Sequence, residues 1–498
     1  MTIHLSILLF FPLVLATLGG LLPRAVAPLA LLVGALVALA YAVLLLFDFD
    51  GGADGLQYVT DDVWITELGV RYTLGVDGLN LWLLGLTTLL FAASALWICV
   101  RPPVERTKLY AFHLGLAETA VLGAFLAQDL ILFVLFFDLM LVPFYFLIGQ
   151  WGSGDRVAAT FKLVVYTLVG SLLMLAAAVA TGVTAGVGPD GTTGFSMAAL
   201  AQAPVGESEQ RWIFAAFALA FLIKMPAFPF HGWMPDGYRS MPLPVLAVFS
   251  GVLSKVAAYG FLRVALPIFP DAVQDFQTVI LLLALASILY GSAQAFTQTN
   301  ARLILGYSSV AQLGFITLGI FALGEAAGAQ GALLQMLNHG LVVAPLFFIV
   351  ALLVERTGSE DIREMGGVAF RAPVLSALFL IVALATLAMP GSANFAGEFL
   401  ILLGLFNTKL ALAIIAFTGV ALASVYMLRM FIRAVHNRVG GGVKSFDIGA
   451  RDALVLVPLV LAILAFAVYP QQALDDSEAT VEKVVGGTEA VAQAGATP

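Results

Sequence analysis

Charged residues and cysteine are scarce in this chain of 498 residues. Only 11% of the residues are charged and 61% are hydrophobic, whereas soluble proteins carry roughly 25% charged residues. A soluble globule of this size cannot cover its surface with so few charges, so the composition excludes a cytosolic enzyme, a secreted disulfide scaffold and a disordered polypeptide. The single cysteine, Cys99, excludes an internal disulfide and any cysteine cluster for zinc or iron–sulfur binding.

Long apolar stretches are abundant instead. They are about 20 residues long, the length of a transmembrane helix, whereas barrel strands alternate over about 10 residues. The first stretch has no basic residue before it and no small-residue cleavage site, so we expect a retained span rather than a signal peptide. The pattern predicts an all-α polytopic membrane protein with fourteen spans, at 3–22, 27–47, 78–100, 108–127, 130–150, 158–186, 212–230, 241–266, 275–297, 301–323, 327–354, 374–406, 410–434 and 452–470.

Basic residues are distributed unevenly between the two sides of these spans. Fifteen Lys and Arg residues lie on one side and five on the other, with three lysines inside helices. Because cytoplasmic loops are the richer in Lys and Arg, both termini are predicted to lie outside the cytoplasm. The Asp- and Gly-rich loop 48–77 is expected to be extramembrane, and the acidic tail after Pro470 is expected to be mobile.

Two predicted spans are interrupted by helix-breaking residues. The seventh contains Pro226 and Pro229, and the twelfth contains Pro390, Gly391 and Asn394. Backbone carbonyls freed by such breaks are tolerated only inside protein or beside water. Interrupted helices at corresponding places in two halves indicate inverted repeats around an ion pathway, although two ordinary proline kinks remain the alternative.

The two predicted repeats and the segments that flank them divide the chain into four parts. These are 1–107, with spans 1–3 and the extramembrane loop; 108–266, the first inverted five-helix repeat (spans 4–8); 275–434, the second repeat (spans 9–13); and 435–498, the last span and the acidic tail.

Several ionisable residues are predicted to lie within spans, where a charge costs roughly 2.5–3.5 kcal/mol on insertion scales. Five of them form the candidate proton relay: Asp138, Lys224, Lys255, His339 and Glu398. The alternative is that they are structural pairs holding helices together, but pairing needs one group of each sign, whereas a relay needs a series of groups that exchange charge. Lys162, Glu118 and His113 are further candidates. A structural role is favoured for Glu118 and His113, and for Lys162 it is equally plausible.

The chemistry of a buried lysine explains why this set suits proton transfer. The proton affinity of a buried amine depends on whether a neighbouring carboxylate is charged, so Asp138 near Lys224 would form a two-state electrostatic switch. Pro143 leaves the carbonyl of Leu139 without its usual donor, which would loosen the helix beside Asp138. The sequence carries no hydrolytic motif, dinucleotide fingerprint or flavin motif. Energy for transport must therefore come from another chain or an opposing ion gradient, and we expect no cofactor and no metal on this chain.

Five sequence segments resemble the antiporter-like subunits of respiratory complex I, the proton-translocating NADH:quinone oxidoreductase. They are residues 138–152 (DLMLVPFYFLIGQWG), 161–175 (FKLVVYTLVGSLLML), 224–236 (KMPAFPFHGWMPD), 307–315 (YSSVAQLGF) and 395–399 (FAGEF). The resemblance covers nearly the whole chain. It is nearest to the subunit M (chain 4) branch of that family, because sister subunits L and N usually carry lysine where this chain has Glu398.

The resemblance implies a proton-pumping membrane-arm subunit that couples quinone reduction elsewhere in the complex to proton translocation. In that family Asp138 occupies the position of the span-five carboxylate paired with Lys224, Lys255 is the bridging lysine, and His339 and Glu398 complete the relay. It also implies neighbouring subunits L and N as partners, and a location in the bacterial inner (plasma) membrane.

The chain departs from the family pattern at three places. Aspartate replaces glutamate at Asp138, Gln312 stands where this branch often has histidine, and residues 240–244 differ from the usual approach to span eight. Two other functions therefore stay open: a subunit of a multi-subunit sodium/proton antiporter, and a scaffold that has lost pumping.

Overall fold

A computed structural model describes residues 4–495, apart from 54, 104, 189–190 and 204. The helices are α1 (Leu5–Leu21), α2 (Ala27–Asp48), α3 (Leu81–Val100), α4 (Thr107–Leu126), α5 (Leu130–Leu139), α6 (Leu141–Trp151), α7 (Arg156–Ala185), α8 (Met197–Gln202), α9 (Glu207–Lys224), α10 (Met234–Ser240), α11 (Leu243–Val248), α12 (Ser254–Gly260), α13 (Leu266–Ile268), α14 (Pro270–Thr297), α15 (Ala301–Ile320), α16 (Ala326–Thr357), α17 (Pro373–Ala385), α18 (Ala393–Thr408), α19 (Leu410–Val435), α20 (Ala450–Val468) and α21 (Gln471–Gly495). The strands are β1 (Gln57–Ile65) and β2 (Val70–Val76), and the short helical turns are η1 (Thr66–Leu68), η3 (Phe230–Trp233), η4 (Phe249–Leu253), η5 (Phe261–Ala265) and η6 (Val368–Phe370).

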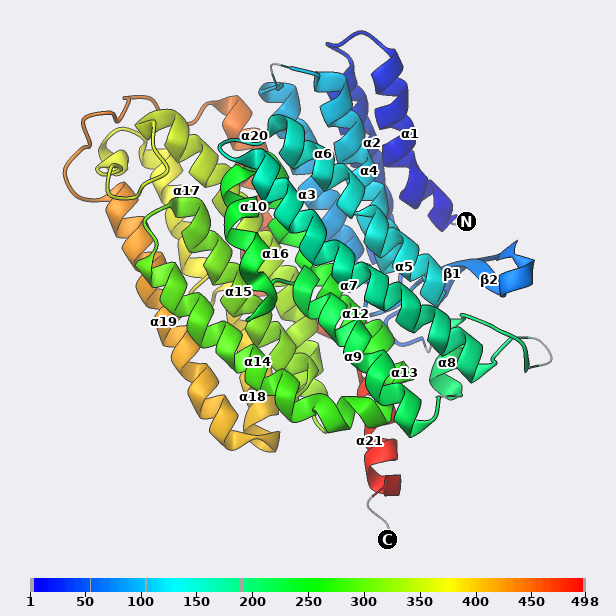
Figure 1. Cartoon of the computed structure of the whole chain (residues 1–498). Coiled ribbons are helices and arrows are strands. Elements are labelled where there is room, and N and C mark those ends of the chain that lie inside the picture. The colour runs from blue at the N-terminus through cyan, green and yellow to red at the C-terminus, as the bar shows by residue number, and fades with distance from the viewer. Residues whose placement is uncertain (1–3, 54, 104, 189–190, 204, 496–498) are drawn as a thin grey trace.

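The helices form one bundle of roughly parallel elements (Figure 1). Within the described residues, eleven helical segments are long and apolar enough to cross a membrane, and α1, α17 and α18 are shorter apolar helices. The prediction of a largely helical polytopic membrane protein is therefore confirmed. The first helices α1 and α2 lie at one end of the bundle and α17 and α19 at the opposite end, as Figure 1 shows.

The centre of the bundle consists of three spans: residues 243–268, α15 and α16. In the first two spans every residue of the most apolar stretch is buried, and in α16 almost every one is. In α2, α19 and α20 only 33% of the corresponding stretch is buried. Lys255, Gln312 and His339 lie on these three central spans, so their side chains are shielded from lipid on every side. The candidate relay therefore passes through the core of the bundle.

The predicted extramembrane loop 48–77 contains a β-hairpin, so the expectation of a purely α-helical chain is wrong in this segment. Strands β1 and β2 pair antiparallel, and Gly69 turns the chain with a positive φ of 67°. The carboxylate of Asp61 bonds the guanidinium of Arg71 across the pair at 2.7 Å. The hairpin is also tied to the bundle, because the Arg71 backbone N–H donates to Asp129 at 3.1 Å.

The acidic tail is not the mobile segment that its composition suggested, because residues 471–495 form helix α21. Four of its residues are buried at a spacing of four, Ala473, Ser477, Val481 and Val485, which is one face of a helix. The indole of Trp82 also donates a 3.0 Å hydrogen bond to Asp476. Asp475, Glu478 and Glu482 are exposed on the outer face, and the small buried side chains explain why overall composition hid the helix.

Both predicted helix breaks are present. Helix α9 ends at Lys224, and the chain resumes as η3 and α10 after the two prolines. The second break separates α17 from α18 over residues 386–392. A further irregularity was not predicted: the span 243–268 contains two π-helical turns, η4 and η5, on either side of Lys255. π-turns carry no proline signature, and they often occur at functional sites.

Candidate functional site

Lys224 lies at the last residue of α9, where the helix break begins. Its side chain is buried, and its ammonium donates a 2.7 Å hydrogen bond to the backbone carbonyl of Phe137 on α5. The same ammonium lies 4.3 Å from the centre of the Phe137 ring. Helix α5 ends two residues later and α6 begins at Leu141, as expected from the missing amide hydrogen of Pro143. The sequence thus predicted the break between α5 and α6 and the buried Lys224, but it did not predict that Lys224 bonds the main-chain carbonyl of Phe137.

Asp138 belongs to the same site. Its carboxylate lies close to the hydroxyl of Ser171 on α7 and within electrostatic range of Lys224. One carboxylate oxygen has no hydrogen-bond partner among the described residues. The structure therefore brings Asp138 and Lys224 together, as predicted, while the ammonium is anchored by main chain.

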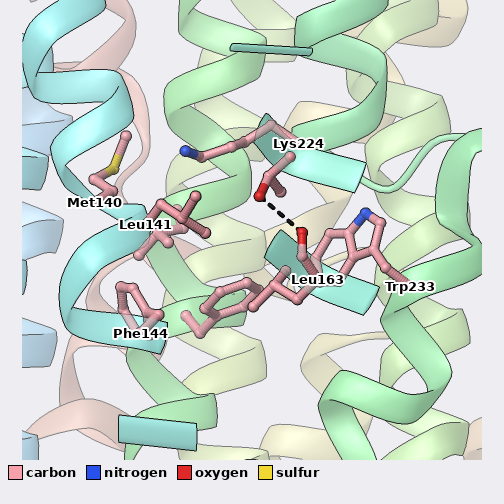
Figure 2. Close-up of a pocket in the computed structure, with 9 residues that line it drawn as sticks. Met140, Leu141, Phe144, Leu163, Lys224 and Trp233 are labelled. Atoms are coloured by element: carbon pink, nitrogen blue, oxygen red, sulfur yellow. Dashed lines mark hydrogen bonds between the residues drawn. The ribbon is translucent and has the colours of Figure 1, made fainter. Parts of the chain in front are cut away.

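A small cavity adjoins this lysine (Figure 2). It is lined by Met140, Leu141, Phe144, Leu163, Thr167, Lys224, Trp233, Phe249 and Leu253. Figure 2 shows the Lys224 side chain extending toward the helix that carries Met140. Phe249 and Leu253 belong to η4, the π-turn that precedes Lys255, so the cavity lies between the elements that carry the two lysines. Its lining is mainly apolar, and among the described residues no chain of side-chain hydrogen bonds joins the two lysines.

Lys255 is fully buried on α12 and donates a 2.6 Å hydrogen bond to the backbone carbonyl of Ser250. The hydroxyl of Ser250 contacts that of Ser309 on α15 at 3.2 Å. His339 on α16 lies within electrostatic range of Lys255 and is also buried. The structure therefore brings Lys255 and His339 together and connects the lysine to α15 through two serines.

Glu398 lies on α18, directly after the second break, and is buried. One of its carboxylate oxygens, Oε1, accepts a 2.9 Å hydrogen bond from the amide of Gln312 on α15. The amide of Gln335 on α16 donates to the Gln312 oxygen at 2.8 Å and approaches Glu398 Oε1 at 3.4 Å. Gln312 is one helical turn from Ser309 on α15, so polar groups extend from Lys255 to Glu398 along this helix.

The other candidates lie apart from this network. Lys162 pairs with Asp236 at 2.8 Å, and both side chains are more than 40% exposed. His113 contacts its own helix through Nδ1 and the Leu109 carbonyl at 2.6 Å. Glu118 is fully buried, and neither of its carboxylate oxygens has a partner among the described residues. The structure thus gives Lys162 and His113 local structural contacts and leaves Glu118 unexplained.

Sequence reasoning missed the neutral polar residues of the site: Ser171, Ser250, Ser309, Gln335 and Asn338. A signal was available on α16, where Gln335, Asn338 and His339 recur at helical spacing within an apolar span. Burying an amide in hydrocarbon is also costly unless it is bonded. No three His, Cys, Asp or Glu side chains of the described residues lie together as a metal site would require.

The chain was compared with known protein families and structures. The family model for the transmembrane region of NADH:quinone oxidoreductase and Mrp antiporter subunits matches residues 127–423. Respiratory complex I from Thermus thermophilus with bound NADH contains a chain that superposes with a TM-score of 0.87 and 31% identity, covering 96% of this chain and 99% of that one. A chain of the Mrp complex from Dietzia sp. DQ12-45-1b has the same fold, with a TM-score of 0.84, 23% identity and 98% coverage of both chains. The chain belongs to the family of membrane subunits shared by these oxidoreductases and antiporters.

Two of the similar proteins within that family are subunits of the same type. NADH-quinone oxidoreductase subunit M of Rhodobacter capsulatus is 36% identical over 488 residues, which are 95% of this chain and 94% of that protein. Subunit M of Escherichia coli (strain K12) is 36% identical over 434 residues, covering 85% of this chain and 84% of that protein. The predicted resemblance to complex I, and to its subunit M branch, is therefore confirmed.

Proposed function

We propose that this chain is a proton-translocating membrane-arm subunit of an NADH:quinone oxidoreductase, which couples quinone reduction elsewhere in the complex to proton movement across the membrane. The observation that carries the proposal is the buried set of Lys224, Lys255 and Glu398, each hydrogen-bonded within the bundle rather than paired at its surface. Similarity to subunit M proteins over most of the chain supports it. We expect no redox centre and no cofactor on this chain, so its translocase activity depends on the rest of the complex.

Each relay residue has a proposed role. Asp138 and Lys224 form the switch at the first break, because the carboxylate can change charge beside an ammonium that main chain holds in place. Lys255 and His339 exchange protons in the centre of the bundle. Glu398 is the terminal group at the second break. A charge change at one group alters the proton affinity of the next, which is how coupled titrating groups pass a proton on.

The proposed membrane topology has fourteen crossings with both termini outside the cytoplasm. The eleven long apolar segments, together with α1, α9 and the α17–α18 pair, would supply them. Two inverted repeats, residues 108–266 and 275–434, would each contain one broken helix, as inverted-repeat transporters do. The excess of basic residues on one side supports this orientation and a bacterial inner membrane location.

The proposed partners are neighbouring antiporter-like subunits of types L and N. Exposed apolar side chains at both ends of the bundle, such as Leu29 and Leu44 on α2 and Phe417 on α19, suit contact with lipid or other membrane helices. In the proposed order of the relay, Asp138 and Glu398 are the two end groups with Lys255 between them, so each would end the relay near a different neighbour.

The proposal is tested in the complete complex reconstituted into vesicles. Lys255→Met keeps the length of the side chain and removes its charge, and we expect NADH-driven proton pumping to fall at least about tenfold. NADH oxidation with an artificial electron acceptor should stay unchanged and serves as the control. Undiminished pumping by this variant would favour the scaffold function. Sodium-dependent proton transport that persists without NADH would favour the antiporter function.

A further inference from the structure

Unpartnered polar atoms concentrate at the second helix break. Among the described residues, fourteen buried side-chain nitrogen and oxygen atoms have no hydrogen-bond partner. Seven of them belong to two short segments, residues 335–339 of α16 and residues 392–398 at the start of α18. Buried polar groups in folded proteins nearly always have a partner, and water supplies it where protein does not. The α16–α18 interface therefore offers a binding place for water beside Glu398.

The two carboxylate oxygens of Glu398 have different surroundings. Oε1 accepts from Gln312 at 2.9 Å and is approached by Gln335 at 3.4 Å. Oε2 is buried and has no partner among the described residues. The carboxyl group is thus held by one oxygen while the other is available.

Side-chain amides cannot relay protons as imidazoles do. The nitrogen of Gln312 or Gln335 is a donor that does not titrate, whereas a histidine has two ring nitrogens that can take up and release a proton. Through Oε1, Glu398 therefore meets amide donors from α15 and α16 that orient it without delivering a proton.

Asn394 is a further buried polar residue near Glu398 on α18 itself. It is one helical turn before Glu398 on α18, so the two side chains share a face of the helix. Asn394 is 1% exposed, and neither its amide nitrogen nor its oxygen has a partner among the described residues. Asn338 of α16 donates at 2.6 Å to the carbonyl of Ala393 and so fixes the first turn of α18 against α16. A water bonded to Asn394 can both donate to Glu398 Oε2 and accept from a donor.

We propose that Asn394 is a positioning residue that holds a water against Oε2 of Glu398, so that protons reach and leave this carboxylate between α16 and α18. Gln312 of α15 and Gln335 of α16 hold the carboxyl group through its other oxygen, Oε1. In the transfer, a hydronium at the water position gives its proton to Oε2, which forms an O–H bond and leaves water. Release is the reverse step. The inference rests on the proposed proton-translocating function and adds the route by which Glu398 takes part in it.

The test measures proton exchange at Glu398 itself as well as pumping. In the complete complex, the carboxyl C=O stretch of Glu398 is assigned by infrared difference spectroscopy as the band lost in Glu398→Gln. Its hydrogen–deuterium exchange rate is then followed after transfer to heavy water. Asn394→Leu keeps the approximate volume and removes both hydrogen-bonding atoms, and we expect exchange and pumping to slow at least about tenfold. Asn394→Ser keeps a hydroxyl that can bond water and should restore both to within about threefold of wild type.

Gln312→Leu provides the matched control on the other oxygen. It should shift the frequency of the Glu398 band, because Oε1 loses a donor, and it should slow exchange less than Asn394→Leu does, because both hydrogen-bonding atoms of Asn394 remain. Wild-type exchange in Asn394→Leu would overturn the route, and so would equal slowing in Gln312→Leu. If the leucine variant does not assemble, Asn394→Ala gives the same comparison without added bulk.

The outcomes separate the route from the function. If Glu398→Gln pumps normally, Glu398 is not part of the relay and the proposed function of this residue fails. If Glu398→Gln stops pumping while Asn394→Leu pumps and exchanges normally, the function stands and the route is wrong.

Discussion

The ammonium of Lys224 donates its hydrogen bond to the backbone carbonyl of Phe137, 2.7 Å away, in the residue directly before Asp138. A main-chain carbonyl cannot change its charge, so this contact holds the ammonium in place whatever the protonation state of the neighbouring carboxylate. Asp138 lies close to the Ser171 hydroxyl instead. The structure thus separates the anchor of Lys224 from the group whose charge influences it.

Replacement of Lys224 tests the switch. We expect Lys224→Ala to reduce NADH-driven proton pumping at least about tenfold, because the variant loses the only ammonium beside Asp138 among the described residues. NADH oxidation with an artificial acceptor should be nearly unchanged. Lys162→Ala is the matched control, since its exposed pair with Asp236 lies outside the network and exposed pairs contribute little. Normal pumping by Lys224→Ala would remove this residue from the mechanism.

Asp138 tests whether charge or side-chain length matters at the same site. Asp138→Glu keeps the charge and lengthens the side chain by one methylene group, so we expect pumping within about threefold of wild type. Asp138→Ala removes the carboxylate and should lower pumping about as much as loss of Lys224. Proton pumping is measured in vesicles, with complex content checked on native gels. Equal losses in both variants would mean that the geometry around Ser171, rather than the carboxylate charge, is limiting.

Asp452 tests a buried ion cluster at the ends of three helices. Its carboxylate bonds Arg101 at 2.7 Å and lies 3.9 Å from Arg356, which has no exposed surface. Asp452→Ala leaves Arg356 without this counter-charge, and breaking such a buried pair costs about 3 kcal/mol or more. We expect a lower melting temperature and less assembled complex.

A surface pair provides the comparison for Asp452. Glu207 and Arg211 are both more than half exposed, and Glu207→Ala should change stability by less than about 1 kcal/mol. Thermal unfolding of the purified complex measures both variants. Equal changes in melting temperature for Asp452→Ala and Glu207→Ala would contradict the expectation that the buried pair contributes more to stability than the exposed pair.

Asp129 gives a prediction on pH dependence. It caps α5 by accepting the N–H groups of Ile131 and Leu132, and burial raises its pKa from 3.8 to about 6. Because the folded pKa lies above the ordinary value, this residue favours folding fully below pH 3.8, and the contribution is lost as the pH rises through about 6. Asp129→Asn keeps the capping oxygen without the charge but loses the acceptor of the Arg71 N–H, so its melting temperature relative to wild type should rise as the pH is raised toward neutral.

The control for this prediction is the loss of the cap. Asp129→Ala lacks the acceptor and should be destabilised by about 1 kcal/mol relative to Asp129→Asn at every pH. The melting temperature of Asp129→Asn relative to wild type should fall as the pH is lowered from neutral to about 5. If the Asn variant is less stable than wild type at neutral pH, the hydrogen bonds of the charged carboxylate stabilise the fold by more than the burial of its charge destabilises it.

Local properties of the sequence were sufficient to predict much of the architecture. The bilayer selects long apolar segments, so span positions follow from hydropathy, and Pro226 and Pro390 mark helix breaks because each removes a backbone donor. The β-hairpin and α21 were missed because their stabilising contacts, such as Trp82 with Asp476, join residues far apart in the chain. The π-turns on either side of Lys255 were missed because no proline marks them in the sequence.

The sequence by itself determined which kinds of groups are buried and where the helices break, because hydrophobicity and proline act locally and the bilayer acts alike on every span. Only the tertiary structure decided which atoms meet. Gln312, Gln335 and Glu398 come from three helices, and Gly397 lets α16 approach α18 closely enough for the Gln335 amide to lie against its backbone. Such contacts depend on close packing between helices, which no pattern along a single segment encodes.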